Sequence, residues 1–184
     1  MNIEEVLKKA LENMDEKYCQ LSQLVNRKSS CIEKNKLQEK KIQERPVAYE
    51  FYHQFRRLIE DEEVEVNFDG SIIQAEVNKK YQHYFRNGKI PDFIIHTPDT
   101  DVNFAVIEFK LASSNITKIK DDLKKLSKFK RKLNYENTVE VIIGDTEQLN
   151  KLDENNDLFI GKELTLIFFN TDSWKAYQVT TKVA

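Results

Sequence analysis

One nearly continuous apolar run, NFAVIEFKL at 103–111, constrains the fold of this 184-residue chain more than any other segment. A run of this kind is typical of a β-strand that is covered on both faces. Glu108 and Lys110 interrupt it, and because side chains alternate along a strand, both lie on the same face. Removing two charges from water costs several kcal/mol per ion unless something compensates. The compensation is either a structural ion pair or a bound cation together with a phosphate.

The patterns before and after this run predict an α/β (α+β) fold, with a central mixed sheet flanked by helices. A helix is expected from Pro46, because proline suits the first helical turn and an apolar stripe follows it. Asp69 and Gly70 indicate a tight turn between two strands. The other expected elements are strands at 64–68, 71–77 and 91–96, a helix over 116–133, a strand at 138–144, and closing strands at 163–169 and 175–183.

Residues 1–45 are predicted to form an N-terminal helical arm, and residues 46–184 to form one domain. Apolar positions recur in the arm with helical spacing, interrupted at Lys17, and the more polar stretch 26–44 is expected to be helical as well. Two interpretations stay open. The arm forms a coiled coil that makes a homodimer, or it packs on its own domain, which is the interpretation we favour.

The composition argues against several classes of protein. Apolar residues make up 40% of the chain and aromatic residues 10%, enough for a hydrophobic core, and the low content of glycine (4) and proline (3) argues against collagen-like or turn-rich all-β structures. No stretch approaches the roughly 20 apolar residues of a membrane span, so no membrane partner is expected. Cys19 and Cys31 provide neither a disulfide framework nor a zinc motif, and a cytoplasmic location is therefore expected.

The charge is balanced overall but uneven locally. The chain has 29 basic and 31 acidic residues, a net charge of −2 that is not typical of a nucleic-acid-binding domain. Residues 118–132, however, contain eight basic and two acidic residues. Such a segment is either a phosphate-binding face or a solvated helix surface.

The turn before the apolar run is expected to place a second carboxylate, that of Asp92, beside Glu108. If 91–97 and 103–111 pair antiparallel about Thr100, Thr97 faces Asn103 and Asp92 faces Glu108. The Cβ atoms of directly opposed residues are about 4.5–5.5 Å apart. Two carboxylates so placed repel each other unless a cation lies between them. Mg²⁺ prefers oxygen ligands and typically combines one or two carboxylates with water and substrate phosphate.

This arrangement, Pro91–Asp92 followed by Glu108–Phe109–Lys110, resembles the PD-(D/E)XK nuclease superfamily, which has the restriction-endonuclease-like fold. The family core runs helix, three strands, helix, strand, in the order expected here for residues 46–144. Many members also carry a glutamate on the first core helix, a position that Glu50 matches. The resemblance covers about the central hundred residues, and the closing strands are compatible with it.

The resemblance implies a role for each matching residue. Asp92 and Glu108 would hold Mg²⁺ or Mn²⁺, and the backbone carbonyl of Phe109 would be a further ligand. Lys110 would orient the attacking water and neutralise phosphate charge. Glu50 would bind a second ion or a metal-bound water. The lysines of the following helix that would contact phosphates are Lys118, Lys120 and Lys124.

The sequence therefore predicts a metal-dependent nuclease that hydrolyses phosphodiester bonds by water attack, with DNA as the expected substrate and RNA as an open alternative. One rival is a non-catalytic nuclease-like domain that binds nucleic acid or a protein partner. Another is a scaffold in which Glu108 and Lys110 form only an intrastrand ion pair. For Glu50, the structural alternative is a hydrogen bond to Gln54 one helical turn further on.

Overall fold

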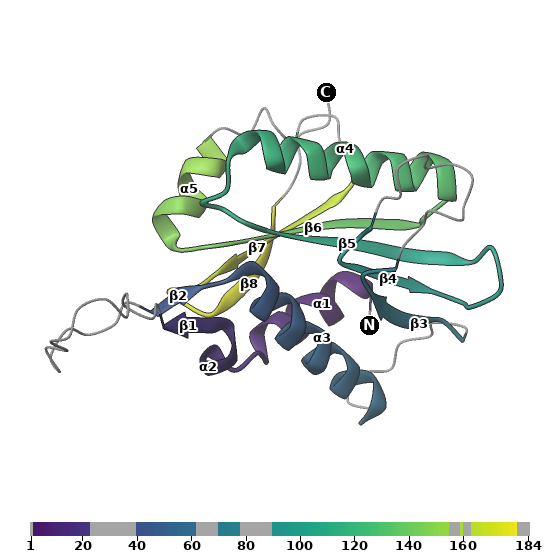
Figure 1. Ribbon diagram of the computed structural model, residues 1–184, viewed down its shortest axis with the longest axis horizontal. Coiled ribbons are helices and arrows are strands. Elements are labelled where there is room, and N and C mark those ends of the chain that lie inside the picture. The colour runs from purple at the N-terminus through teal and green to yellow at the C-terminus, as the bar shows by residue number, and fades with distance from the viewer. Residues whose placement is uncertain are drawn as a thin grey trace, which may run out of the picture.

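A computed structural model describes residues 2–22, 40–61, 70–77, 90–154, 159 and 163–179. Its centre is a six-stranded sheet in the order β3-β4-β5-β6-β7-β8 (Figure 1). Strands β5, β6 and β7 are parallel to one another, and the other neighbours are antiparallel. The sheet strands are β3 (Ile72–Ala75), β4 (Phe93–His96), β5 (Asn103–Leu111), β6 (Asn137–Gly144), β7 (Thr165–Asn170) and β8 (Lys175–Val179).

Helices cover both faces of this sheet (Figure 1). Helices α1 (Ile3–Glu12) and α3 (Glu44–Glu60) pack on one face, and α4 (Ile116–Leu133) and α5 (Thr146–Glu154) pack on the other. The described part of the chain is thus a mixed α/β structure with three layers. None of its helices combines the length and the apolar character that crossing a bilayer requires.

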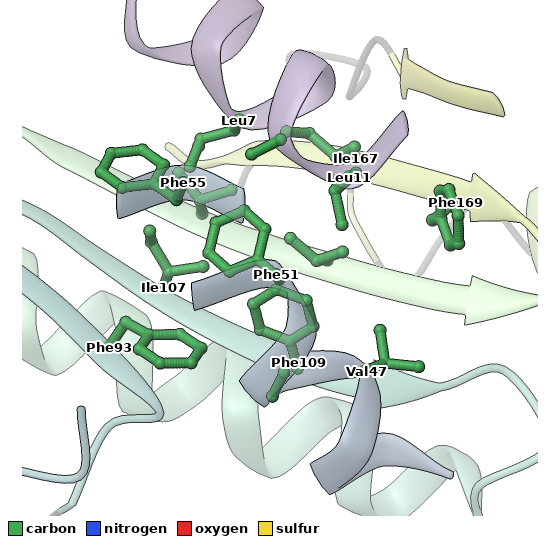
Figure 2. Packing of buried hydrophobic residues seen from close by; sticks show 14 of the residues in the cluster. Leu7, Leu11, Val47, Phe51, Phe55, Phe93, Ile107, Phe109, Ile167 and Phe169 are labelled. Atoms are coloured by element: carbon green, nitrogen blue, oxygen red, sulfur yellow. The ribbon is translucent and has the colours of Figure 1, made fainter. Parts of the chain in front are cut away.

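The first face is an apolar core rich in aromatic rings (Figure 2). Phe51 of α3 contacts Phe109 of β5 at a centroid distance of 5.0 Å, Phe93 of β4 at 5.7 Å and Phe55 of its own helix at 5.8 Å. Each of these four rings is at most 2% exposed. Burying a phenylalanine contributes roughly 1.5–3 kcal/mol, so this cluster holds α3 firmly against the sheet.

The residues of β5 alternate between the two layers. Ala105, Ile107 and Phe109 belong to the apolar core between the sheet and helices α1 and α3, which we call the α1/α3 core. Val106 packs with residues of α4 on the other face. Glu108 continues the Val106 series and pairs with a lysine of α4. The aromatic face of β5 therefore fixes which way its charged residues point.

The expected order of helix, three strands, helix and strand is observed from α3 to β6. The strand at 103–111 and the helix at 116–133 have the predicted bounds, and β4 pairs with β5 through Phe93 and Ile107, as predicted. The turn end of the hairpin differs from the prediction. His96, not Thr97, pairs with Asn103, because a bulge shifts the register after Ile95.

The predicted turn at Asp69 and Gly70 is only partly described. Residues 64–69 lie outside the described residues, so the hairpin itself is not tested. Gly70 has a φ of +79°, a left-handed conformation that suits a glycine in a turn.

The N-terminal segment differs in part from the helical arm that the sequence predicts. Helix α1 is capped by Asn2, whose side chain accepts a hydrogen bond from the backbone of Glu5. Its apolar face joins the α1/α3 core, as expected for an arm that packs on its own domain. The short helix α2 (Glu16–Cys19) leads into β1 (Gln20–Ser22), which pairs with β2 (Lys40–Ile42). The helix predicted over 26–44 is therefore wrong at 40–42, and residues 26–39 lie outside the described residues.

Helix α3 begins at Glu44, two residues before the predicted start at Pro46. Proline lacks a backbone N–H to donate, a loss that is tolerated anywhere in the first turn because those N–H groups have no partner within the helix. The early start places one more carboxylate on α3, close to the end of β5.

Candidate functional site

Asp92 and Glu108 lie side by side at the start of the β4–β5 pairing. The antiparallel register through Phe93 and Ile107 sets Asp92 opposite Glu108. The backbone N–H of Phe109 donates to Asp92 Oδ2 at 2.7 Å, which ties the Asp92 side chain to β5. Burial raises the pKa of Asp92, and the hydrogen bond from Phe109 partly offsets this.

Glu108 is almost completely buried, with 2% of its surface exposed. Its Oε2 lies 2.6 Å from Nζ of Lys125 on α4, and its Oε1 has no hydrogen-bond partner in the described part of the chain. Burial raises the pKa of Glu108 well above its usual value, although the ammonium group of Lys125 acts in the opposite direction. A buried carboxylate with one free oxygen is unusual, because such groups are normally hydrogen-bonded.

Lys110 does not form the intrastrand pair with Glu108 that the sequence leaves open. Its Nζ lies 3.2 Å from Glu44 Oε1 and 3.1 Å from Asp122 Oδ2. Glu44 also accepts a hydrogen bond from the N–H of Leu111 at 3.3 Å, so its carboxylate spans two consecutive residues of β5. Burial lowers the pKa of Lys110, but Asp122 and Glu44 outweigh it, and the pKa lies above its usual value. Lys110 is therefore an ammonium group at neutral pH, suited to positioning and charge neutralisation.

Helix α4 contributes an acid and a base to the same place. Asp122 Oδ1 lies 3.4 Å from Lys125 Nζ, so this carboxylate contacts both lysines. Lys125 Nζ also donates to the carbonyl of Ile90, at 3.4 Å. The side chains of Asp122 and Lys125 are only 16% and 15% exposed, in contrast to most charged residues of this helix.

Glu140 of β6 completes the group from the neighbouring strand. It is the register partner of Glu108 in the parallel β5–β6 pair. It is fully buried, and over the described ranges neither of its carboxylate oxygens has a hydrogen-bond partner. Burial, followed by the charge of Glu108, raises the pKa of Glu140 well above its usual value. We refer to these seven residues together as the charged cluster: Glu44, Asp92, Glu108, Lys110, Asp122, Lys125 and Glu140.

The sequence prediction missed four members of the charged cluster, although signals for them existed. Asp122 follows the buried Ile119 by three residues and precedes Leu126 by four, so it falls inside the apolar stripe of its helix. Lys125 follows Asp122 by three residues, which places the two on adjacent positions of the helix surface. Glu140 interrupts an apolar strand in the same way as Glu108 does. Glu44 gave no signal, because the helix was expected to begin after it.

The structure does not bring Glu50 into the charged cluster. Its Oε1 accepts hydrogen bonds from Gln54 Nε2 at 2.7 Å and from the backbone N–H of Asp15 at 3.2 Å. Glu50 is 8% exposed, so it lies on the buried side of its helix. The hydrogen bond from Gln54 is the one considered as the structural alternative for this residue, and the hydrogen bond from Asp15 joins α3 to the start of α2.

The three lysines predicted to contact phosphates, Lys118, Lys120 and Lys124, lie on the exposed side of α4. Lys124 pairs with Asp121 at 3.3 Å, an exposed contact that contributes little. None of the three forms an ion pair with a carboxylate of the charged cluster within the described residues. Phe109 contributes its N–H to Asp92, and the role expected of its carbonyl stays a prediction.

A small cavity of about 90 Å³ opens beside Asp92. It lies between α3 and the edge of the sheet, and Glu44, Arg45, Glu76 and Asp92 supply its polar lining. Glu76 forms an exposed ion pair with Arg45 at 3.6 Å. Asp92 is thus one of the residues that line a cavity large enough for a small ligand such as water or a cation.

Asp92 and Glu108 have the oxygen chemistry that Mg²⁺ prefers, and such sites typically use one or two carboxylates. The unpartnered Oε1 of Glu108 fits this assignment, since it leaves one oxygen for a ligand while Lys125 holds the other. Over the described ranges, no set of three or more His, Cys, Asp or Glu side chains is arranged to hold a metal ion. Compared with protein families, curated proteins and solved structures, the chain gives no match.

Proposed function

We propose that this chain is a metal-dependent nuclease of the PD-(D/E)XK type, with a restriction-endonuclease-like core from α3 to β6. It would hydrolyse phosphodiester bonds of nucleic acid, with DNA as the expected substrate. The observation that carries the proposal is the placement of Asp92 beside Glu108, with Lys110 two residues further along the same strand. The observed order of elements from α3 to β6 supports it.

Asp92 and Glu108 are the residues that would hold Mg²⁺ or Mn²⁺, with the carbonyl of Phe109 as a further ligand. A divalent cation at this place supplies a more acidic water and neutralises charge on the phosphate. The free oxygen of Glu108 and the cavity beside Asp92 are the features of the chain that favour this assignment.

The remaining residues act by position and charge. Lys110 carries a proton, so it would attract the phosphate and orient water rather than act as a base. Glu44 and Asp122 hold its ammonium group from two different helices, which restricts the directions in which the side chain can point. Lys125 compensates the charge of Glu108, which would otherwise be buried without a counterion.

The test is cleavage of single- and double-stranded DNA and RNA by purified protein, with Mg²⁺ or Mn²⁺ and with EDTA. Asp92→Asn and Lys110→Ala should each lower metal-dependent cleavage by about 100-fold or more, the size expected when one group that stabilises a charged transition state is removed. Glu50→Gln is the matched control. Like Asp92→Asn, it replaces a carboxylate by an amide, but Glu50 is on α3 and lies outside the charged cluster, so cleavage should be unchanged. Cleavage that survives in both variants of the charged cluster would contradict the proposal.

A second candidate function is a nuclease-like domain that binds nucleic acid or protein without cutting. One observation favours it. Both lysines of the charged cluster are already paired with carboxylates, at 2.6–3.4 Å, so their charges are compensated without a substrate. This candidate predicts nucleic-acid binding that is unchanged by EDTA and by Asp92→Asn, together with no cleavage under any metal condition.

A further inference from the structure

Three buried carboxylate oxygens of the charged cluster have no hydrogen-bond partner among the residues that the structure describes. They are Oε1 of Glu108 and both oxygens of Glu140, and the two residues are 2% and 0% exposed. Buried polar atoms are hydrogen-bonded in the large majority of cases, and each exception calls for a physical explanation. Here three exceptions fall on two residues that face each other across β5 and β6.

The register brings these two side chains close together. Neighbouring strands are about 4.8 Å apart, and register partners in a parallel pair point to the same side of the sheet. Glu108 faces α4, so Glu140 faces the same layer. The charges of Lys110 and Lys125 lower the pKa of Glu140, which agrees with a Glu140 side chain that faces the layer where these lysines lie.

The charges of the charged cluster do not balance. It contains five carboxylates and two lysines, and the ion pairs of those lysines are with Glu44, Glu108 and Asp122. Glu140 receives none of them. A positive charge that is close to Glu108 and Glu140 would satisfy the three free oxygens at once.

We propose that Glu140 is a further ligand of the divalent cation, binding it together with Glu108 from β6. The cation would then be shared by Asp92 at the start of β4, Glu108 on β5 and Glu140 on β6. Because no three acidic side chains of the described residues are already arranged around one ion, these three would have to converge when the cation binds. This inference rests on the proposed function, because it assigns one more ligand to the same site.

The rival explanation is that Glu140 is a neutral acid with no ligand. Both explanations expect that removal of the carboxylate leaves the metal-free protein as stable as before or more stable, because a buried group without a partner is lost. Only the metal-ligand explanation expects a simultaneous loss of metal binding. A variant that keeps or gains stability without metal but loses metal affinity therefore identifies Glu140 as a ligand and not as a residue with a structural role alone.

The experiment measures thermal unfolding and isothermal titration calorimetry with Mn²⁺, for the full chain and for Glu140→Gln, Asp92→Asn and Glu50→Gln. Mn²⁺ should raise the Tm of the unaltered chain and of Glu50→Gln. Glu140→Gln should keep or raise the Tm in EDTA. It should weaken Mn²⁺ binding about tenfold or more, because loss of even a group that only supports a metal ligand typically costs about 10–100-fold in affinity. Glu140→Met is a second variant, because its apolar side chain removes the polar atoms altogether and should give the same loss.

The outcomes separate this inference from the proposed function. If Glu140→Gln and Glu140→Met bind Mn²⁺ as the unaltered chain does while Asp92→Asn does not, Glu140 is no ligand and the nuclease proposal stands. If the unaltered chain itself shows no Mn²⁺ binding, both proposals are overturned. If Mn²⁺ binding depends on Glu140 but no nucleic acid is cut, the ligand assignment holds and the nuclease proposal fails.

Discussion

The two faces of β5 differ in how they are stabilised. On the α1/α3 side, Ile107 and Phe109 are buried among aromatic rings and need no partner beyond packing (Figure 2). On the α4 side, Glu108 and Lys110 depend on counterions from other elements. One strand thus carries an apolar face that is stabilised by packing alone and a charged face that needs counterions from other elements. The first face holds the strand in place, which allows the second to keep buried charge that does not contribute to stability by itself.

The largest effect is expected on the apolar face. Phe51→Ala removes a ring that contacts Phe55, Phe93 and Phe109, and it should lower the free energy of unfolding by about 3–5 kcal/mol. Urea unfolding measures this change. Tyr49→Ala, at an exposed position of the same helix, should change the free energy of unfolding by less than about 1 kcal/mol. Equal effects of the two variants would mean that the aromatic cluster does not hold α3.

A smaller loss of folding stability is expected when a counterion on the charged face is removed. Lys125→Met leaves Glu108 buried without a counterion, which should cost about 3 kcal/mol at pH 7.5 in the absence of metal. The double variant with Glu108→Gln should recover most of that loss, because no unpaired charge remains. Lys124→Met, at the exposed neighbouring position, is the control and should have little effect. A double variant no more stable than Lys125→Met would show that the two residues are not coupled.

The pH dependence of stability should also come from the charged face. Burial raises the pKa of Glu140 in the folded state above its unfolded value, so the folded state retains a proton that the unfolded state loses. The resulting loss of folding stability is absent below the pKa of Glu140 in the unfolded state, which is about 4.3. It grows as the pH rises from there to the pKa of Glu140 in the folded state. Unfolding in EDTA from pH 4 to pH 8 should show Glu140→Gln gaining stability over the unaltered chain, by at most about 1.4 kcal/mol per pH unit. A constant difference over this range would contradict the raised pKa.

The smallest effect is expected at Glu50, which touches neither the aromatic centre of the core nor the charged cluster. In Glu50→Gln the side-chain carbonyl can still accept the hydrogen bonds from Gln54 and from the N–H of Asp15. The free energy of unfolding should therefore change by about 1 kcal/mol or less. A loss of Mn²⁺ binding in this variant would instead place Glu50 at the metal site, as the sequence predicts.

The sequence predicts best what depends on neighbours along the chain. Asp92 and Glu108 come together across one short turn, so alternation and turn length are enough to place them opposite each other. The same reasoning fails at His96, because a bulge adds a residue to one strand and nothing in the pattern marks it. The alternation of β5 also correctly places Glu108 and Lys110 on one face.

The counterions could not be predicted in this way. Lys125 and Asp122 lie on the helix that crosses from β5 to β6, and Glu44 begins a helix on the other side of the sheet. Their meeting depends on how two helices dock on a twisted sheet, which apolar periodicity does not specify. Glu140 is different, because a charged residue within a buried strand is itself a visible signal.

The parallel pairing of β5 with β6 has a kinetic consequence. Parallel neighbours require a long crossover, here through α4, and Lys110 meets Glu44 across 66 positions of the chain. Loop closure of this kind is slow compared with the formation of a local hairpin. During synthesis, the β4–β5 hairpin can form early, but the full set of acidic groups comes together only after β6 has been added. A nascent or truncated chain that ends before Asn137 would have Asp92 beside Glu108, yet would lack the strand that carries Glu140.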